Sequence, residues 1–334
     1  MPFLREFLAQ EHVETELGFE VLSKLLLELP KMQAVDFAGC SSRQFRDTIA
    51  SLLSSRPWPS QLTIRRLSLH KCMTLTTPVF EAILPRLVHL THLDVAATRI
   101  NDTALRAIPH QARLTHLNLA RCSLLTAPAV IDFVRSHPAA KSLVFFSLST
   151  DAVSNQLLST DDVSALLPIL PRTLRSFSIR GSSMDPSHIP LLKSLIGQLE
   201  ELAIGRLPVV HLQPLFAEDH TVRYLDLGDL NERELELSTI FSSHDSLINA
   251  GRRPLEVIEL AESVYKRLSR SASLGMAGWV ANEIGSRYWI VSVRTSDGHR
   301  PWKMGTKGWG MRKVPVAVAE VGGMFGSYMF GQKL

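Results

Sequence analysis

The chain has 334 residues, with 36 Lys or Arg, 32 Asp or Glu and a formal net charge of +4 at pH 7. It contains no run of about eighteen uncharged apolar residues, so we expect no membrane-spanning helix. Charged residues such as Arg5, Glu6 and Glu11 lie near the start, so we expect no secretory signal peptide. Together with three cysteines that form no disulfide framework, these features predict a protein of the cytoplasm or the nucleus.

One short phrase recurs along most of the chain. IRRLSLHKC (64–72), LTHLDVAAT (90–98) and LTHLNLARC (114–122) are versions of the same pattern, and looser versions follow. The first core residues of successive phrases are separated by 23 to 34 residues. A period in this range with an L-x-L core is typical of a leucine-rich-repeat solenoid. Those first core residues are Val35, Leu67, Leu93, Leu117, Leu143, Phe177, Leu202, Leu225 and Ile258.

Each repeat is expected to join one strand to one helix. Within a phrase, alternate positions such as Leu67 and Leu69 lie on one face of a strand. The segment that follows carries apolar residues at helical spacing, as at Val79, Ile83 and Leu84. Because neither element can bury its apolar face alone, neighbouring repeats must stack and share a core. We therefore predict an α/β fold, a curved horseshoe of about nine repeats with a parallel sheet on the concave side and helices on the convex side.

The three cysteines fit the same pattern. Cys40, Cys72 and Cys122 each stand five residues after the first core position of a repeat. Thr98 and Ser182 occupy this position in two other repeats, so the site favours a small, weakly polar side chain. One cysteine per repeat makes a poor disulfide framework, and the sequence has no C-x-x-C pair that would indicate zinc.

This pattern resembles the cysteine-containing leucine-rich repeats of the ribonuclease-inhibitor-like superfamily, as found in F-box and leucine-rich-repeat proteins. The resemblance covers roughly residues 20–263. It implies a curved, non-catalytic scaffold that binds a protein, often as the substrate receptor of a ubiquitin ligase. An F-box places a Leu–Pro pair ahead of a helix. Here Leu29 and Pro30 follow the predicted helix in FEVLSKLLLELPKMQAVDF (19–37), so we identify no F-box.

The composition changes after residue 263, so we predict a solenoid domain over 1–263 and a basic extension rich in Trp and Gly over 264–334. The extension has eleven Lys or Arg and three Asp or Glu, a net charge of +8, which leaves −4 for the solenoid. RYWIVSV (287–293) and VPVAVAEV (314–321) have the composition of strands that could cap the solenoid and bury the tryptophans. The alternatives are a partner-binding extension and contact with nucleic acid or an anionic membrane surface.

A short motif at the start of this extension points to regulation. In KRLSRSAS (266–273), Lys266 and Arg267 precede Ser269, and Arg270 lies three residues before Ser273. Basic-directed kinases favour this spacing, and a phosphate would add about two negative charges beside the arginines. Ser269 and Ser273 are therefore candidate phosphorylation sites, and a simple polar junction is the alternative.

The concave face carries the candidate partner-binding residues. Strand alternation exposes the positions one before, one after and three after the first core residue of each repeat. These positions are basic and rich in histidine in the early repeats and acidic in the late ones, with an apolar spot at Val144 and Phe146. Such a field would orient a partner of opposite polarity, and the apolar spot would anchor it. The candidates are Arg66, His70, His92, Asp94, His116, Asn118, Val144, Phe146, Arg180, Glu201, Tyr224, Asp226 and Glu259.

Two histidines and a carboxylate on this face could in principle bind a metal. His92 and His116 share a column on adjacent strands, with backbones about 4.8 Å apart, and Asp94 lies on the same face. An open sheet face offers no enclosing pocket, so we predict no metal and no other cofactor.

No catalytic motif occurs in a supporting context, so we predict that the chain is not an enzyme. The predicted function is a protein-interaction scaffold that binds its partner through the concave face, with a ubiquitin-ligase substrate receptor as its specific form. The alternative is a module that docks on nucleic acid or an anionic membrane surface through its basic tail.

Overall fold

The computed structural model describes residues 3–9, 16–55, 57–150, 156–217, 219–230, 247, 254–284 and 287–293. The chain forms two compact units, one of residues 1–148 with 169–173 and one of residues 149–168 with 174–334. No helix among the described residues is long and apolar enough to cross a membrane. The domain boundary expected at residue 263 stays a prediction.

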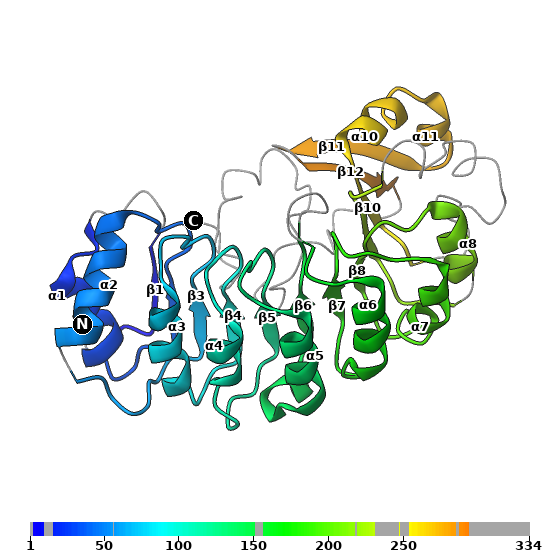
Figure 1. Cartoon of the computed structure of the whole chain (residues 1–334). Coiled ribbons are helices and arrows are strands. Elements are labelled where there is room, and N and C mark those ends of the chain that lie inside the picture. The colour runs from blue at the N-terminus through cyan, green and yellow to red at the C-terminus, as the bar shows by residue number, and fades with distance from the viewer. Residues whose placement is uncertain are drawn as a thin grey trace. The chain divides into compact units, whose positions relative to one another are not determined.

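The first unit contains a parallel sheet whose strands pair in chain order. Helices α2 to α5 lie side by side along one side of these strands (Figure 1). The strands are β1 (Glu6–Leu8), β2 (Ala34–Asp36), β3 (Arg66–Ser68), β4 (His92–Asp94), β5 (His116–Asn118) and β6 (Phe145–Ser147). The helical segments are α1 (Phe19–Ser23), η2 (Lys24–Glu28), α2 (Arg43–Ser55), α3 (Thr77–Ile83), η3 (Leu84–Arg86), α4 (Asp102–Arg106), α5 (Ala127–Ser136) and η4 (Pro138–Ser142).

The second unit continues the parallel pairing of strands in chain order and then adds two antiparallel strands. Strands β8, β9 and β10 follow β7 in parallel, but β12 pairs antiparallel with β10, and β11 pairs antiparallel with β12. The strands are β7 (Ser176–Ser178), β8 (Glu201–Ala203), β9 (Tyr224–Leu227), β10 (Val257–Leu260), β11 (Trp279–Ile284) and β12 (Arg287–Ser292). The helical segments from residue 160 onward are α6 (Thr160–Leu166), η5 (Leu167–Ile169), η6 (Pro186–His188), α7 (Ile189–Lys193), α8 (Val209–Ala217), α10 (Glu262–Leu268) and α11 (Ala272–Met276).

The predicted leucine-rich-repeat solenoid is confirmed by this alternation of strand and helix. Eight of the nine predicted first core residues lie inside a strand, and all eight are buried. The strand expected at 287–293 is also confirmed, since β12 covers Arg287–Ser292. The strand expected at 314–321 lies outside the described residues.

The strand register predicted for the fifth repeat is wrong. Leu117 of β5 lies opposite Phe146 of β6 rather than opposite Leu143, so the strand begins later than predicted. The reason is η4, whose short turn after α5 places Leu143 in the core before the strand starts. Phe146 takes the core position and is completely buried.

One repeat strand was missed at the start of the chain. Strand β1 pairs in parallel with β2, and Phe7 lies opposite Val35. The Phe7 and Phe37 rings pack with their centroids 6.2 Å apart. The short sequence EFL lacks the leucine pair of the later phrases, which is why the pattern did not reveal it.

A tight turn follows the strand in several repeats. The residue four positions after the first core residue of the repeat has a positive φ. The values are 85° at Gly39, 59° at Lys71, 56° at Ala97, 56° at Arg121 and 84° at Gly181. This backbone conformation is left-handed and costs an L-residue about 1–2 kcal/mol. The turn delivers the next residue, the cysteine position, into the core.

The cysteine position works as predicted, as a small buried donor. The Cys72 thiol donates to the carbonyl of Phe37 at 3.1 Å, and the Cys122 thiol donates to the carbonyl of Val95 at 3.1 Å. Burial raises the pKa of the Cys122 thiol to about 12, so the sulfur keeps its proton and remains a donor. All three cysteines are buried, and none of them forms a disulfide bond.

The left-handed turn generates a stability prediction at Ala97. Replacing Ala97 with Gly removes the steric cost of the positive φ, against a loss of about 0.4–1 kcal/mol from greater freedom of the unfolded chain. We expect Ala97→Gly to leave the free energy of unfolding unchanged or to raise it by up to about 1 kcal/mol. The matched control, Ala104→Gly inside α4, should lower it by about 1 kcal/mol or more. Urea unfolding followed by circular dichroism distinguishes them, and equal destabilisation by both would contradict the prediction.

Candidate functional site

The face of the first sheet opposite the helices, here called the inner face, carries one row of side chains in cross-strand register. The row runs over the strands from β1 to β6. At one end Arg66 forms an ion pair with Glu6, reaching past Ala34 on the strand between them. Its members are Glu6, Ala34, Arg66, His92, His116 and Phe145.

The middle of the row is an aromatic stack. The His92 and His116 rings lie 4.1 Å apart between centroids and 9° from parallel. Phe145 continues the stack, 6.0 Å from His116 at an interplanar angle of 22°. The adjacency of the two histidines was predicted from the sequence, and Phe145 was not. The apolar spot predicted at Val144 and Phe146 was wrong for Phe146, because the register of β6 places Phe145 on the inner face instead.

Local hydrogen bonds fix the orientation of both histidine rings. The Thr91 hydroxyl lies 3.0 Å from the carbonyl of Arg65, and the Thr115 hydroxyl lies 3.1 Å from the carbonyl of Thr91. Each hydroxyl also lies 2.9 Å from Nδ1 of the following histidine. The threonine before each histidine therefore holds its ring in the stack.

Both histidines are neutral at physiological pH. Burial lowers the pKa of His92 to about 3, and the nearby His116 and Arg66 add to the effect. Burial alone lowers the pKa of His116 to about 4. A charged imidazolium in this stack would lose hydration and lie against its neighbour. The row thus offers one partly exposed cation at Arg66 and the partly exposed ring of His92 beside it, while His116 and Phe145 are buried, at 9% and 5% exposure.

The residues one position after the first core residue of each repeat, here called the second column, accept hydrogen bonds at the ends of the strands. Asp94 Oδ1 accepts the backbone N–H of Ala96 at 3.0 Å, and Asn118 Oδ1 accepts that of Ala120 at 3.2 Å. Asp36 and Asp226 make the same bond in their repeats. This contact closes a turn two residues after the polar side chain. Asp94, Asn118 and Asp226 therefore have a structural role, which strand alternation alone did not reveal.

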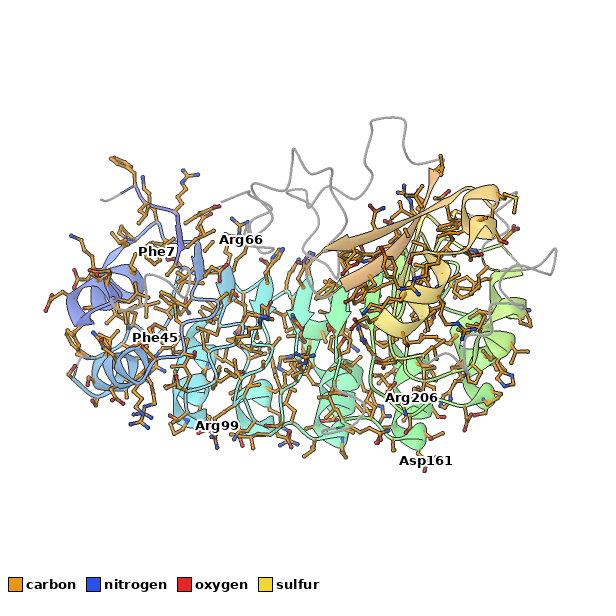
Figure 2. All side chains as sticks on the ribbon, turned by 90° about the horizontal axis from the view of Figure 1, so that it is seen from above. Phe7, Phe45, Arg66, Arg99, Asp161 and Arg206 are labelled. Carbon is orange, nitrogen blue, oxygen red and sulfur yellow. The ribbon has the colours of Figure 1, made fainter. Side chains whose placement is uncertain are left out.

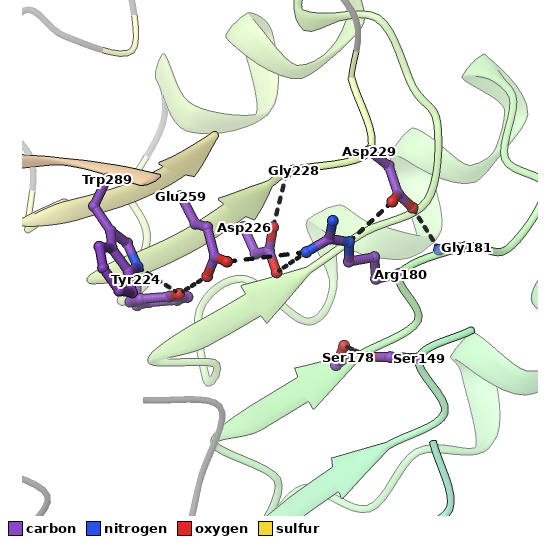
Figure 3. A network of polar contacts seen from close by, with 10 residues as sticks. All are labelled: Ser149, Ser178, Arg180, Gly181, Tyr224, Asp226, Gly228, Asp229, Glu259 and Trp289. Carbon is purple, nitrogen blue, oxygen red and sulfur yellow. Dashed lines mark hydrogen bonds and ion pairs between the residues drawn. The ribbon is translucent and has the colours of Figure 1, made fainter. Parts of the chain in front are cut away.

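The inner face of the second unit holds a network around Arg180 (Figure 3). Its Nε donates to Asp229 at 2.9 Å, and Nη1 lies 3.4 Å from Asp226 and 3.9 Å from Glu259. Burial opposes the guanidinium charge, but Asp226 and Asp229 outweigh it and raise the pKa of Arg180. Asp229 also accepts the backbone N–H of Gly181 at 2.5 Å, which holds the left-handed turn in place.

Trp289 joins the network from the antiparallel strand β12. In register it lies opposite Glu259, and its Nε1 donates to the Tyr224 hydroxyl at 3.3 Å. That hydroxyl in turn contacts the Glu259 carboxylate. Tyr224, Val257 and Trp289 form one buried cluster.

The exposure predicted for the late candidates was wrong. Glu201, Tyr224, Asp226 and Glu259 are all buried, at 6% exposure or less. Glu201 accepts a hydrogen bond from the Ser176 hydroxyl at 2.6 Å. The pairing of β12 with β10 is non-local, and although β12 was predicted as a strand, its partner was not. Arg180 keeps about a third of its side chain exposed and remains the accessible member of this group.

A Ser–His–Asp arrangement lies outside the inner face. Ser164 Oγ is 3.1 Å from His188 Nε2, and Asp185 Oδ1 is 3.3 Å from His188 Nδ1. The two ring nitrogens face serine and aspartate as in a catalytic triad, but the proton is on the opposite nitrogen. The backbone N–H of Asp185 donates to Nδ1 at 3.1 Å, so the ring proton lies on Nε2, which cannot take a proton from serine. Nε2 also lies 3.1 Å from the carbonyl of Thr160, so the fully buried His188 links two repeats.

Among the described residues, no group of three or more His, Cys, Asp or Glu side chains could hold a metal ion. The partly exposed groups of the inner face are Arg66 and His92 in one unit and Arg180, which lies over carboxylates, in the other.

The stacked histidines generate a pH prediction. Their folded-state pKa values lie below the ordinary value of 6.5, so the unfolded chain takes up protons first as the pH falls. Their contribution to stability is complete above about pH 6.5 and is lost progressively as the pH falls towards 4 and then 3. At pH 5.5 each histidine should lower the free energy of unfolding by about 1.4 kcal/mol. Urea unfolding at pH 7.5 and 5.5 measures this loss, and the double variant His92→Gln/His116→Gln should show less of it. An equal loss in both proteins would exclude the stack as its source.

His188 generates a second stability prediction. Replacing it with Ala leaves the Asp185 N–H and the Thr160 carbonyl without their ring partner and opens a cavity, so we expect a loss of about 2–4 kcal/mol. The exposed His89→Ala change should stay within about 0.5 kcal/mol of the wild type. Thermal or urea unfolding compares the two. A His188→Ala protein as stable as His89→Ala would show that the contacts between these repeats contribute little.

No protein-family model matches the chain. It is 30% identical over 235 residues to the F-box protein YLR352W of Saccharomyces cerevisiae, which covers 65% of this chain. The match covers 26% of the relative, so the chain spans about a quarter of that protein's length.

Two solved structures are similar at low identity. Rad7, in its complex with Elc1 in yeast, matches with a TM-score of 0.45 and 14% identity, over 67% of this chain and 63% of that chain. The leucine-rich-repeat protein LegL7 of Legionella pneumophila matches with a TM-score of 0.42 and 14% identity, over 78% and 83%. The recurring L-x-L pattern, the parallel strands that it forms and the buried cysteine position show that the chain has the fold of a leucine-rich-repeat solenoid.

Proposed function

We propose that the chain is a non-catalytic scaffold that binds a partner protein through the inner face of its first unit. The observation that carries this proposal is the row in which Arg66 precedes the stacked rings of His92, His116 and Phe145. Arginine and aromatic side chains contribute most of the binding energy in protein interfaces. A partner with a carboxylate beside an apolar or planar group would match this row.

The row is rigid before binding. The two histidines are held by threonine hydroxyls and by their own stacking, and Arg66 is held by Glu6. Side chains that are already ordered lose little conformational entropy when a partner binds. The row is therefore suited to binding a partner without rearrangement.

The specific form that we propose is a substrate receptor of a ubiquitin ligase in the cytoplasm or the nucleus. Support comes from the 30% identity with an F-box protein and from the resemblance of the repeats to those of F-box and leucine-rich-repeat proteins. In this arrangement the repeats select the substrate, and a separate module makes the link to the ligase.

Two matched arginine variants test the proposed surface. Arg66 lies on the strand side of the first unit, and Arg99 lies at the helix side (Figure 2). Loss of a charged contact costs about 1.5–3 kcal/mol, so Arg66→Ala should lower the recovery of a partner by roughly tenfold or more. Arg99→Ala makes the same chemical change on an exposed side chain and should leave recovery unchanged.

The measurement is co-purification of the tagged full-length variants from cells, with quantitative mass spectrometry and circular dichroism of each purified protein. A protein depleted with Arg66→Ala but retained with Arg99→Ala is an inner-face partner. If that set includes a ubiquitin-ligase scaffold or its substrates, the specific form is supported. Partners equally retained by both variants would refute the inner-face site, and partners without any ligase component would refute the receptor role.

A further inference from the structure

The segment between α10 and α11 holds a cluster of basic residues around an exposed serine. Helix α10 ends at Leu268, and Ser269 is its C-terminal capping residue. Lys266 and Arg267 lie in the last turn, and Arg270 follows the serine directly. Ser269, Lys266, Arg267 and Arg270 are all exposed. The hydroxyl is therefore accessible in the folded protein and is surrounded by cations on both sides in the sequence.

We propose that Ser269 is a phosphorylation site for a protein kinase that selects basic residues N-terminal to serine. Lys266 and Arg267 stand at the third and second positions before it, the spacing that an acidic substrate groove in such a kinase would recognise. In the reaction Ser269 Oγ bonds to the γ-phosphorus of ATP as the bond to the bridging β–γ oxygen breaks. ADP leaves, and the kinase's catalytic carboxylate takes the hydroxyl proton.

The structure separates Ser269 from the other serines of the motif. Ser273 lies in the first turn of α11, is half-buried, and its carbonyl accepts the N–H of Ala277 at 3.0 Å. Ser271 is the half-buried N-terminal capping residue of the same helix. Both side chains are less exposed than that of Ser269. Ser269 lies at a turn, where its hydroxyl makes a long 3.4 Å contact with the carbonyl of Lys266.

Phosphorylation would change the charge of this surface. Residues 262–270 carry three cations and one anion, Glu262, which pairs with Lys266. A phosphoserine carries about −2 at neutral pH and so brings the local charge from +2 to about zero. A phosphate at a helix C-terminus is disfavoured by the helix dipole, and Arg267 and Arg270 are placed to offset that repulsion.

Helix α10, which ends next to Ser269, packs against the strand that reaches the Arg180 network. Tyr265 of α10 packs against Tyr288 of β12, with ring centroids 5.1 Å apart. The next residue of β12 is Trp289, which donates to Tyr224. A charge change at the end of α10 thus occurs on the helix that packs beneath this hairpin.

The test uses the full chain, ATP and the catalytic subunit of a cyclic-AMP-dependent protein kinase, with intact-mass and tandem mass spectrometry. One phosphate on Ser269 is expected. It should be absent from Ser269→Ala, present in the matched control Ser273→Ala, and formed at least tenfold more slowly in Arg267→Gln. Phosphate on Ser271 or Ser273, or modification of a synthetic 262–276 peptide but not of the folded chain, would overturn the proposal.

A second measurement tests the role of the arginines. The ³¹P signal of the phosphorylated chain should titrate with a phosphoserine pKa below its ordinary value of about 6, because cations favour the dianion. The pKa should rise in Arg270→Gln. An identical titration in both proteins would show that Arg270 does not hold the phosphate. Neither measurement depends on the inner-face partner, so the two proposals can fail separately.

Discussion

Hydrogen bonds from one repeat to a backbone carbonyl of the repeat before it recur along the stack, and much of this structure depends on them. At one end of the strand, Thr115 donates to the carbonyl of Thr91, and Thr91 donates to that of Arg65. At the other end, the thiols of Cys72 and Cys122 donate to carbonyls in an earlier repeat. The carbonyls of Arg65 and Thr91 each accept two backbone N–H groups as well, so the side-chain donors reinforce links that the backbone already makes. The threonine before the strand and the cysteine after it are therefore parts of one solution to the joining of neighbouring repeats.

This solution also determines what the inner face can present. The turn that delivers the cysteine needs a left-handed residue, and an Asx contact closes the strand just before it. Positions in the second column are thereby used for structure. In the first column Arg66 and His92 stay partly exposed, His116 and Phe145 are buried, and the threonine before each histidine orients its ring. The row from Arg66 to Phe145 thus follows from the way the repeats stack.

The sequence predicts what depends on local periodicity and misses what depends on register or on distant strands. The L-x-L pattern is clear at Leu67, Leu93 and Leu117, and each of these residues lies at the centre of its strand. In SLVFFSL (142–148) both sets of alternate positions contain apolar residues. Strand alternation alone therefore does not indicate whether Phe145 or Phe146 points into the core. The turn η4 decides it. Glu259 and Tyr224 look like exposed positions in their own repeats, and only the antiparallel approach of Trp289 buries them.

The histidines show why residue type alone could not define the site. In His92 and His116 a threonine hydroxyl lies 2.9 Å from Nδ1 and holds the ring in the stack. In His188 a backbone N–H occupies Nδ1, so the proton moves to Nε2 and the ring links two repeats. The same side chain is thus part of a neutral stack on one surface and a buried tie on another. The role of each histidine depends on its hydrogen-bond partners. These partners are set by the folded structure and cannot be read from the repeated sequence pattern.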